Sequence, residues 1–429
     1  MTPLTDPSAG KQSRGPSRES HGGREQPRRW QDVVRATGLL APDGTTRPTI
    51  FAEMSALAER TGAVNLGQGF PDVDGPDVVK RAAIAAIEAG HNQYPPGAGI
   101  PALRQAIAGH QRRHYGLDPD PETEVLVTAG ATEALAAAVL ALAGPGDEVL
   151  TLEPFYDAYA AVIALAGATH TTAPLVRGPG GFRIDPAGLR AAMTDRTRIV
   201  LINSPHNPTG TVLTHAELEL IAQLATARDA VVITDEVYEH LVYDAVAHIP
   251  IATLPQMAGR TLTISSAGKT FSFTGWKIGW VSGPAPLVEA VRTVKQFLTY
   301  VSGAPFQPAI TTALTDDRAA AWVLELAASL TRRRDLLCAG LEHAGFTVVR
   351  PQGTYFVVAD GAPLGYDDGA ALCRRLPELA GVVGVPVSAF THATSGPDVA
   401  LRSAVRFTFV KRESVLREAV DRLAALTPR

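Results

Sequence analysis

The sequence predicts an α/β fold with a mostly parallel β-sheet between two layers of helices. From about residue 64, short runs rich in β-branched residues alternate with longer amphipathic segments of helical period. The short runs are almost continuously apolar, which is typical of strands that are buried on both faces of a parallel sheet. In such a sheet, ligands bind beyond the carboxyl ends of the strands.

The elements are expected in the following order. Residues 1–29 are rich in Ser, Pro, Gly, Gln and Arg and poor in large apolar side chains, so we expect a disordered tail. Its arginine pair, Arg28 and Arg29, is not followed by the apolar stretch of an export signal. The expected strands are 124–128, 148–151, 198–203, 230–234 and 260–264, and the helices between them are 132–143, 156–166 and 214–227.

The pattern changes after about residue 330. A helix is followed by short strands at 346–350, 354–359 and 405–409 and by a last helix that ends near residue 426, which indicates a smaller α+β domain. We therefore expect a tail (1–29), an N-terminal arm with part of the small domain (30–80), a large domain (81–315) and a small C-terminal domain (316–429).

Composition excludes several classes of protein. The 429 residues have a net charge of −4, which gives no basic field for nucleic acid, and no apolar run approaches the length of a membrane helix. The two cysteines, Cys338 and Cys373, lack the spacing of a metal site. We expect neither disulfides nor a metal, and a reducing cytoplasm suits the chain best.

Polar residues follow three of the expected strands. At 128–135 small residues lead into a helix, so either the backbone N–H groups of the turn bind an anion or Thr132 only caps the helix. Asn207 lies in a Pro- and Gly-containing turn that could hold its amide rigidly, although turn formation alone would explain the pattern. Asp235 ends an apolar strand. Either it shares a helical face with Tyr238, three residues later, or it serves only as a helix cap.

Lys269 follows the expected strand 260–264 in a turn of small residues. A lysine amine that is desolvated, or that lies near other cations, can become a nucleophile toward a carbonyl group. Gly268-Lys269-Thr270 also resembles the end of a nucleotide-binding P-loop, but that pattern requires a glycine where this chain has Thr263. An NTPase is therefore disfavoured.

The four strand ends together match one ligand. A phosphate favours a helix N-terminus, a hydroxyl and a lysine; a pyridine nitrogen favours an aspartate; a phenolate favours Tyr and Asn donors; and an aldehyde reacts with an amine. Pyridoxal 5′-phosphate (PLP) has all four groups.

The chain from about residue 51 to 426 resembles a class I/II aminotransferase of fold type I. It is most similar to the branch of kynurenine, glutamine and methionine aminotransferases, and within it to the actinobacterial N-succinyldiaminopimelate aminotransferases. This resemblance implies a mostly parallel seven-stranded sheet in the large domain. The segments that support it are 65–72, 92–97, 204–210, 234–240, 265–269, 274–280 and 405–409.

The resemblance assigns roles around the cofactor. Lys269 would bind the aldehyde covalently and then move the proton between substrate Cα and cofactor C4′. Asp235 would keep the pyridine nitrogen protonated. Asn207 and Tyr238 would donate hydrogen bonds to the ring oxygen, and Tyr156 would stack on the ring. The residues implied to bind the phosphate are Gly130, Ala131, Thr132, Ser266 and Lys277, together with Tyr94 from a neighbouring subunit of a homodimer.

The resemblance also indicates the reaction and the substrate contacts. Arg406 would bind the substrate α-carboxylate, assisted by Asn207 and the backbone of Gly69. Phe51 occupies the position where kynurenine aminotransferases have a tryptophan. We expect ping-pong transamination between N-succinyl-LL-2,6-diaminopimelate and 2-oxoglutarate or glutamate, as in lysine biosynthesis, a preference suggested by segments 300–308 and 363–368. The alternatives are a broad kynurenine, glutamine or methionine aminotransferase and a carbon–sulfur β-lyase.

Overall fold

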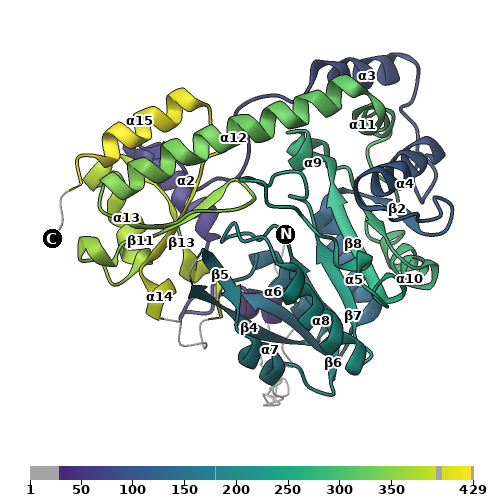
Figure 1. Cartoon of the computed structure of the whole chain (residues 1–429), viewed down its shortest axis with the longest axis horizontal. Helices are drawn as coiled ribbons and strands as arrows, with labels where there is room; N and C mark the ends of the chain where they lie inside the picture. Colours follow the sequence, from purple (N-terminus) through teal and green to yellow (C-terminus); the bar gives the residue numbers. More distant parts are fainter. Residues whose placement is uncertain (1–28, 179, 393–398, 427–429) are drawn as a thin grey trace, which may run out of the picture.

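A large, mostly parallel sheet forms the centre of the molecule (Figure 1). The computed structural model describes residues 29–178, 180–392 and 399–426. In hydrogen-bonded order the strands of this sheet are β2 (Val125–Thr128), β9 (Gly279–Ser282), β8 (Thr261–Ser266), β7 (Val231–Asp235), β6 (Thr197–Asn203), β3 (Glu148–Glu153), β4 (Thr169–Gly178) and β5 (Gly181–Ile184). Pairing is parallel from β8 to β4, whereas β9 is antiparallel to both of its neighbours.

The five expected strands of this sheet are confirmed, with ends that differ by at most two residues. The expected number of strands is wrong: within the described residues the sheet has eight strands, not seven. The eighth is β5, which forms an antiparallel hairpin with β4. Its turn includes Gly180 and Gly181, with φ of 79° and 124°, a backbone region that glycine adopts without strain.

Helices cover both faces of the sheet because side chains along the inner strands alternate between two cores. Ile199 and Leu201 face one core, and Val200 and Ile202 face the other. The first face is covered by α5 (Gly130–Leu142), α6 (Asp157–Ala166) and α10 (Ala285–Lys295). The second is covered near β6 by α7 (Pro186–Ala192) and α8 (His215–Ala227), and near β2 by α3 (Asp77–Glu88), α4 (Pro101–Tyr115) and α11 (Phe306–Thr315).

Between these two groups of helices, the second face of β7 and β8 includes a strip of buried polar residues. Thr234, Thr263 and Ser265 are buried there, on strands whose other residues are mostly apolar. Buried polar groups require hydrogen-bond partners, so this strip needs polar side chains opposite it.

A second, smaller layer packs around the long helix α12 (Asp317–His343), which runs across the molecule in Figure 1. Its antiparallel sheet has the order β10 (Thr347–Val349), β11 (Phe356–Asp360), β14 (Ala404–Thr408) and β13 (Val385–Pro386). The strands β1 (Val64–Asn65) and β12 (Val382–Val383) form a short parallel pair. The surrounding helices are α2 (Ile50–Thr61), α13 (Gly369–Ala380), α14 (Val399–Arg402) and α15 (Glu413–Leu423).

The expected α+β pattern of this region is confirmed, whereas the domain limits stay a prediction. The expected tail lies outside the described residues except for Arg29, which begins α1 (Arg29–Ala36). No helix in the described part of the chain is long and apolar enough to cross a membrane.

Candidate active site

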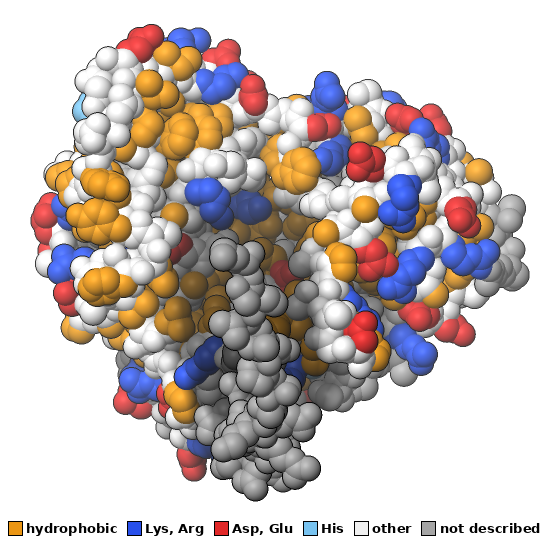
Figure 2. Space-filling model, turned by 180° about the vertical axis from the view of Figure 1, so that it is seen from behind, with side chains coloured by type: hydrophobic (Ala, Val, Ile, Leu, Met, Phe, Trp, Pro, Cys, Tyr) orange, Lys and Arg blue, Asp and Glu red, His pale blue; other side chains and the backbone are white. Residues whose placement is uncertain are grey.

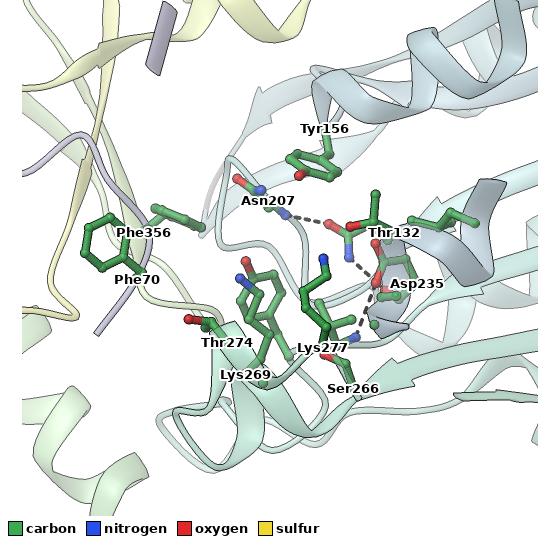
Figure 3. A pocket seen from close by; sticks show the side chains of 18 of the residues that line it. Phe70, Thr132, Tyr156, Asn207, Asp235, Ser266, Lys269, Thr274, Lys277 and Phe356 are labelled. Atoms are coloured by element: carbon green, nitrogen blue, oxygen red, sulfur yellow. Dashed lines mark hydrogen bonds between the residues drawn. The ribbon is translucent and has the colours of Figure 1, made fainter. Parts of the chain in front are cut away.

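A cavity of about 320 Å³ opens at the carboxyl ends of β6, β7 and β8, where a parallel sheet is expected to bind its ligand (Figure 3). The second sheet and α2 complete its walls. All but one of the site residues predicted from the sequence line it: Phe51, Gly69, Gly130, Ala131, Thr132, Tyr156, Asn207, Asp235, Tyr238, Ser266, Lys269, Lys277 and Arg406. The exception is Tyr94.

Lys269 lies on the short helix α9 (Ala267–Thr270), directly after β8. Its Nζ donates a hydrogen bond of 3.2 Å to the hydroxyl of Tyr355, which in turn donates one of 2.6 Å to the carbonyl of Gly69. The same Nζ is 5.8 Å from the ring centroids of both Tyr238 and Tyr355. Figure 3 shows Lys269 and Lys277 extending into the cavity from one side, opposite Tyr156.

Asp235 is fixed at the end of β7 by three neighbours. Its Oδ2 accepts a 2.7 Å hydrogen bond from the hydroxyl of Tyr159, and its Oδ1 accepts one of 3.4 Å from the Val237 backbone N–H. The Asn203 amide donates to the Asp235 carbonyl oxygen at 2.7 Å. Burial raises the pKa of Asp235 to about 6, although the Tyr159 hydroxyl opposes the shift. Keeping the Asp235 carboxyl ionised therefore costs free energy unless a cationic partner lies beside it.

Two interpretations of this strand end are wrong. Residues 237–240 form turns rather than a helix, so Asp235 caps no helix. Tyr238 therefore shares no helical face with Asp235. The i→i+3 hydrogen bonds Glu239 N to Glu236 O and Leu241 N to Tyr238 O reverse the chain instead.

The N-terminus of α5 forms a cradle for an anion. The helix begins at Gly130, where φ is 76°, and Thr132 lies in its first turn, so the prediction that Thr132 caps the helix is wrong. A Cβ at Gly130 would lie 3.2 Å from Cε of Lys277. Free N–H groups, the positive end of the helix dipole and a lysine therefore converge here, with Ser266 also lining the cavity.

Arg406 projects from β14 and is buried. Its Nη1 donates to Asn207 Oδ1 at 2.9 Å, and its Nη2 donates to the Gly67 carbonyl at 3.0 Å. Its guanidinium carbon lies 4.0 Å from the ring centroid of Phe356 and 5.4 Å from that of Phe51. Burial lowers the pKa of Arg406 to about 10, so it stays charged at neutral pH.

One nitrogen of this guanidinium makes no hydrogen bond within the described residues. Nε of Arg406 is buried and has no hydrogen-bond partner among the described residues. An unsatisfied charged donor is costly, so the site lacks an acceptor that an anionic ligand would supply.

Tyr94 lies outside the cavity. Its side chain is 81% exposed, and its ring makes an edge contact with Tyr300 at 5.4 Å between centroids. Within one chain, therefore, it does not reach the site.

Three residues of the site were not predicted from the sequence. Tyr159 and Asn203 orient Asp235, and Tyr355 holds the Lys269 amine. Asn203 could have been found, because it is a polar residue at the carboxyl end of a buried parallel strand. Tyr355 had no such signal, since it lies in the second sheet region, far from Lys269 in the sequence.

Comparisons with known proteins agree with this geometry. The family model for aminotransferase class I and II matches residues 61–423. A probable N-succinyldiaminopimelate aminotransferase of Mycobacterium tuberculosis is 58% identical over 387 residues, which cover 89% of this chain and 96% of that protein. The methionine aminotransferase of Escherichia coli is 38% identical, covering 88% and 96% of the two chains.

Solved structures give the same result. The N-succinyldiaminopimelate aminotransferase from M. tuberculosis superposes with a TM-score of 0.85 at 58% identity, covering 89% of this chain and 97% of that one. An aspartate aminotransferase mutant from Thermus thermophilus gives a TM-score of 0.83 at 35% identity, with 94% and 100% covered. The predicted resemblance and fold class are confirmed. The chain belongs to the aminotransferase class I and II family and is a PLP-dependent aminotransferase.

Proposed function

We propose that this enzyme transfers an amino group between N-succinyl-LL-2,6-diaminopimelate and 2-oxoglutarate, using PLP bound in the cavity at the ends of β6, β7 and β8. The observation that supports this substrate pair is the 58% identity, over 89% of the chain, to the mycobacterial protein named for that substrate. The methionine and kynurenine aminotransferases are more distant, at 36–38% identity.

The cavity fits PLP at each of its ends. The cradle formed by the α5 N-terminus and Lys277 suits a dianionic phosphate. Asp235, whose buried carboxylate needs a cationic partner, suits a protonated pyridine nitrogen. Tyr156 offers an aromatic face opposite Lys269, whose amine suits an aldehyde.

PLP, when bound, supplies an aldehyde that condenses with amines and a ring that accepts electrons from the substrate. Lys269 would supply the amine that holds the aldehyde and would move the proton at substrate Cα. The hydroxyl of Tyr355 orients that amine. Asp235, oriented by Tyr159, would keep the pyridine nitrogen protonated, and Asn207 and Tyr238 would donate hydrogen bonds to the ring oxygen.

Arg406 binds the substrate α-carboxylate. Two of its donors are anchored to Asn207 and Gly67, so its plane is fixed before substrate arrives. The unpartnered Nε donates to one carboxylate oxygen, and the guanidinium charge favours the other. Phe51 and Phe356 exclude water from this contact.

A homodimer completes the site. Tyr94, Phe297 and Tyr300 are 81%, 84% and 55% exposed, which is unusual for large apolar rings unless another chain covers them. Figure 2 shows one face of the molecule, with positive and negative side chains interspersed around a central hollow. We expect Tyr94 to reach the phosphate of the neighbouring subunit. The domain limits and the cytoplasmic location stay predictions.

Borohydride reduction tests the cofactor assignment. Reduction of the purified enzyme should fix the cofactor mass on the peptide that contains Lys269. The matched variant Lys277→Ala should keep the covalent label but bind PLP more weakly, whereas Lys269→Ala should lose both label and turnover. A label on another peptide contradicts the assignment.

Amino-donor profiling tests the substrate. We expect kcat/KM with N-succinyl-LL-2,6-diaminopimelate and 2-oxoglutarate to exceed that with kynurenine, methionine or glutamine by about tenfold or more, since a succinyl group adds contacts that the smaller donors cannot make. A higher value for kynurenine or methionine would favour the broad aminotransferase. Pyruvate release from cystathionine without any 2-oxo acid would favour the β-lyase.

A further inference from the structure

Three histidines meet on the face of the sheet that is opposite the α5 and α6 layer. His110 and His114 lie one turn apart on α4, and His240 lies in the turns after β7. Their ring centroids form a nearly equilateral triangle, with sides of 4.6, 4.9 and 4.9 Å. One ligand nitrogen from each ring lies within 4.8 Å of the other two. The three imidazoles are therefore close enough to share one ligand.

This cluster is separate from the PLP cavity. It opens into a second cavity of about 300 Å³, which Thr270 and Asp317 also line. Lys269 lines the PLP cavity and Thr270 the second one, so α9 lies between them. None of the three histidines lines the PLP cavity, and the transamination chemistry does not require them.

The nitrogens are available as ligands. Nε2 of His110 and Nε2 of His240 are 2.7 Å apart, a hydrogen-bond distance that requires one of them to present an unprotonated lone pair. Nδ1 of the buried His110 has no partner among the described residues. A histidine–histidine hydrogen bond would explain two of the rings, but it does not explain why His114 joins them at the same separation.

A buried carboxylate adjoins the cluster. Oε2 of Glu239 lies 4.0 Å from Nε2 of His240 and accepts a 2.7 Å hydrogen bond from the Tyr115 hydroxyl. Its Oε1 accepts a hydrogen bond from the hydroxyl of Ser265, within the polar strip of β8. Both carboxylate oxygens thus accept hydroxyl donors, so the carboxylate is oriented beside the imidazoles and favours a cation there.

We propose that His110, His114 and His240 bind a zinc ion, with water from the second cavity as the fourth ligand. Three imidazoles with one open position form an established type of tetrahedral zinc site. With Zn–N bonds of about 2.0–2.1 Å, tetrahedral geometry needs about 3.3 Å between ligand nitrogens and about 5 Å between ring centroids. The ring centroids already meet the second requirement. The ligand nitrogens, of which two are 2.7 Å apart and all three lie within 4.8 Å of one another, meet the first after the rings rotate.

Equilibrium dialysis of the full-length, PLP-loaded enzyme tests the site. After EDTA treatment, dialysis against ZnCl₂ and elemental analysis should give one zinc per chain. His114→Gln should weaken zinc binding by a factor on the order of 100, since a ligand contributes at least as much as its outer-shell partners. His114 is exposed, so this variant should keep its fold, its PLP absorbance and its activity in EDTA. The matched control is His91→Gln, an exposed histidine outside the cluster.

Co²⁺ provides a second readout, because a tetrahedral site with nitrogen ligands gives an intense visible absorption that an octahedral surface site does not. We expect this absorption in the wild-type enzyme and in His91→Gln, and its loss in His114→Gln. The proposal is overturned if no zinc is retained, if His114→Gln binds zinc like the wild type, if both variants lose equal affinity, or if bound Co²⁺ is octahedral.

Discussion

The buried carboxyl of Asp235 should make the PLP-free protein less stable as pH rises from about 4 to 7. The carboxyl is 5% exposed, and its pKa rises from 3.8 to about 6 because burial disfavours the charged form. Between these two values the folded state therefore binds more protons than the unfolded state. It follows that the contribution of Asp235 to stability is greatest below pH 3.8 and is lost as pH rises through about 6.

The size of the effect follows from the shift. A difference of about two pKa units corresponds to roughly 3 kcal/mol, and the full penalty is present at pH 7. Asp235→Asn removes the titration and keeps an oxygen that can accept the hydrogen bond from the Tyr159 hydroxyl. The PLP-free variant should therefore be more stable than the PLP-free wild type at pH 7, and the advantage should vanish near pH 4.

Differential scanning calorimetry of both PLP-free proteins between pH 4.5 and 7 measures this difference as a gap in Tm. Comparing two variants at each pH cancels the titration of the other carboxyls. With PLP bound, a protonated pyridine nitrogen would offset the buried charge, so the gap at pH 7 should shrink or change sign. A gap that does not depend on pH, or that widens toward pH 4, would refute the reasoning.

Three further outcomes are expected. Arg406→Lys should lower kcat/KM for every amino donor by about 100- to 1000-fold in steady-state assays, because lysine lacks the planar fork that meets a carboxylate. Gly279→Ala would place a Cβ 2.6 Å from the backbone carbonyl carbon of Gly130. PLP titration should therefore show a dissociation constant raised by roughly tenfold. An unchanged dissociation constant would mean that the N-terminus of α5 can shift at little cost in free energy. Tyr159→Phe removes a hydrogen-bond donor that lowers the pKa of Asp235. The midpoint of the pH-dependent change in cofactor absorbance should therefore lie at a higher pH in the variant than in the wild type.

The parallel part of the fold could be predicted because its strands are buried on both faces. The expected strand 198–203, for example, contains the continuous apolar run 199–202, and its short length and β-branched residues favour a buried strand over a helix. β4, β5 and β9 were not predicted. β5 and β9 are short and pair antiparallel with their neighbours, so their identity depends on segments that are distant in the sequence. β4 is parallel to β3, but only two of its residues are buried, so it lacks the continuous apolar run of the inner strands.

Three of the cofactor residues could be predicted from the residues alone, because each lies at or just after a strand end that is recognisable by itself. Asp235, Asn207 and Lys269 all belong to this class. Tyr355 and Arg406 lie in the second sheet region, and only the docking of that region onto the large sheet brings them to the site. The resemblance supplied Arg406. Tyr355 has no local pattern that would reveal it.

The two-residue period of a strand explains how two sites can share one strand end. Along β8, Ser266 lines the PLP cavity, whereas the preceding Ser265 points to the other face and binds Glu239 beside the histidine cluster. Along β7, Thr234 faces the polar strip and the next residue, Asp235, lines the PLP cavity. A one-residue slip of either strand would exchange the two faces and destroy both sites. A buried polar strip behind the cofactor strands therefore does not need to serve transamination, because it belongs to the opposite face of the sheet, where α4 supplies the histidines.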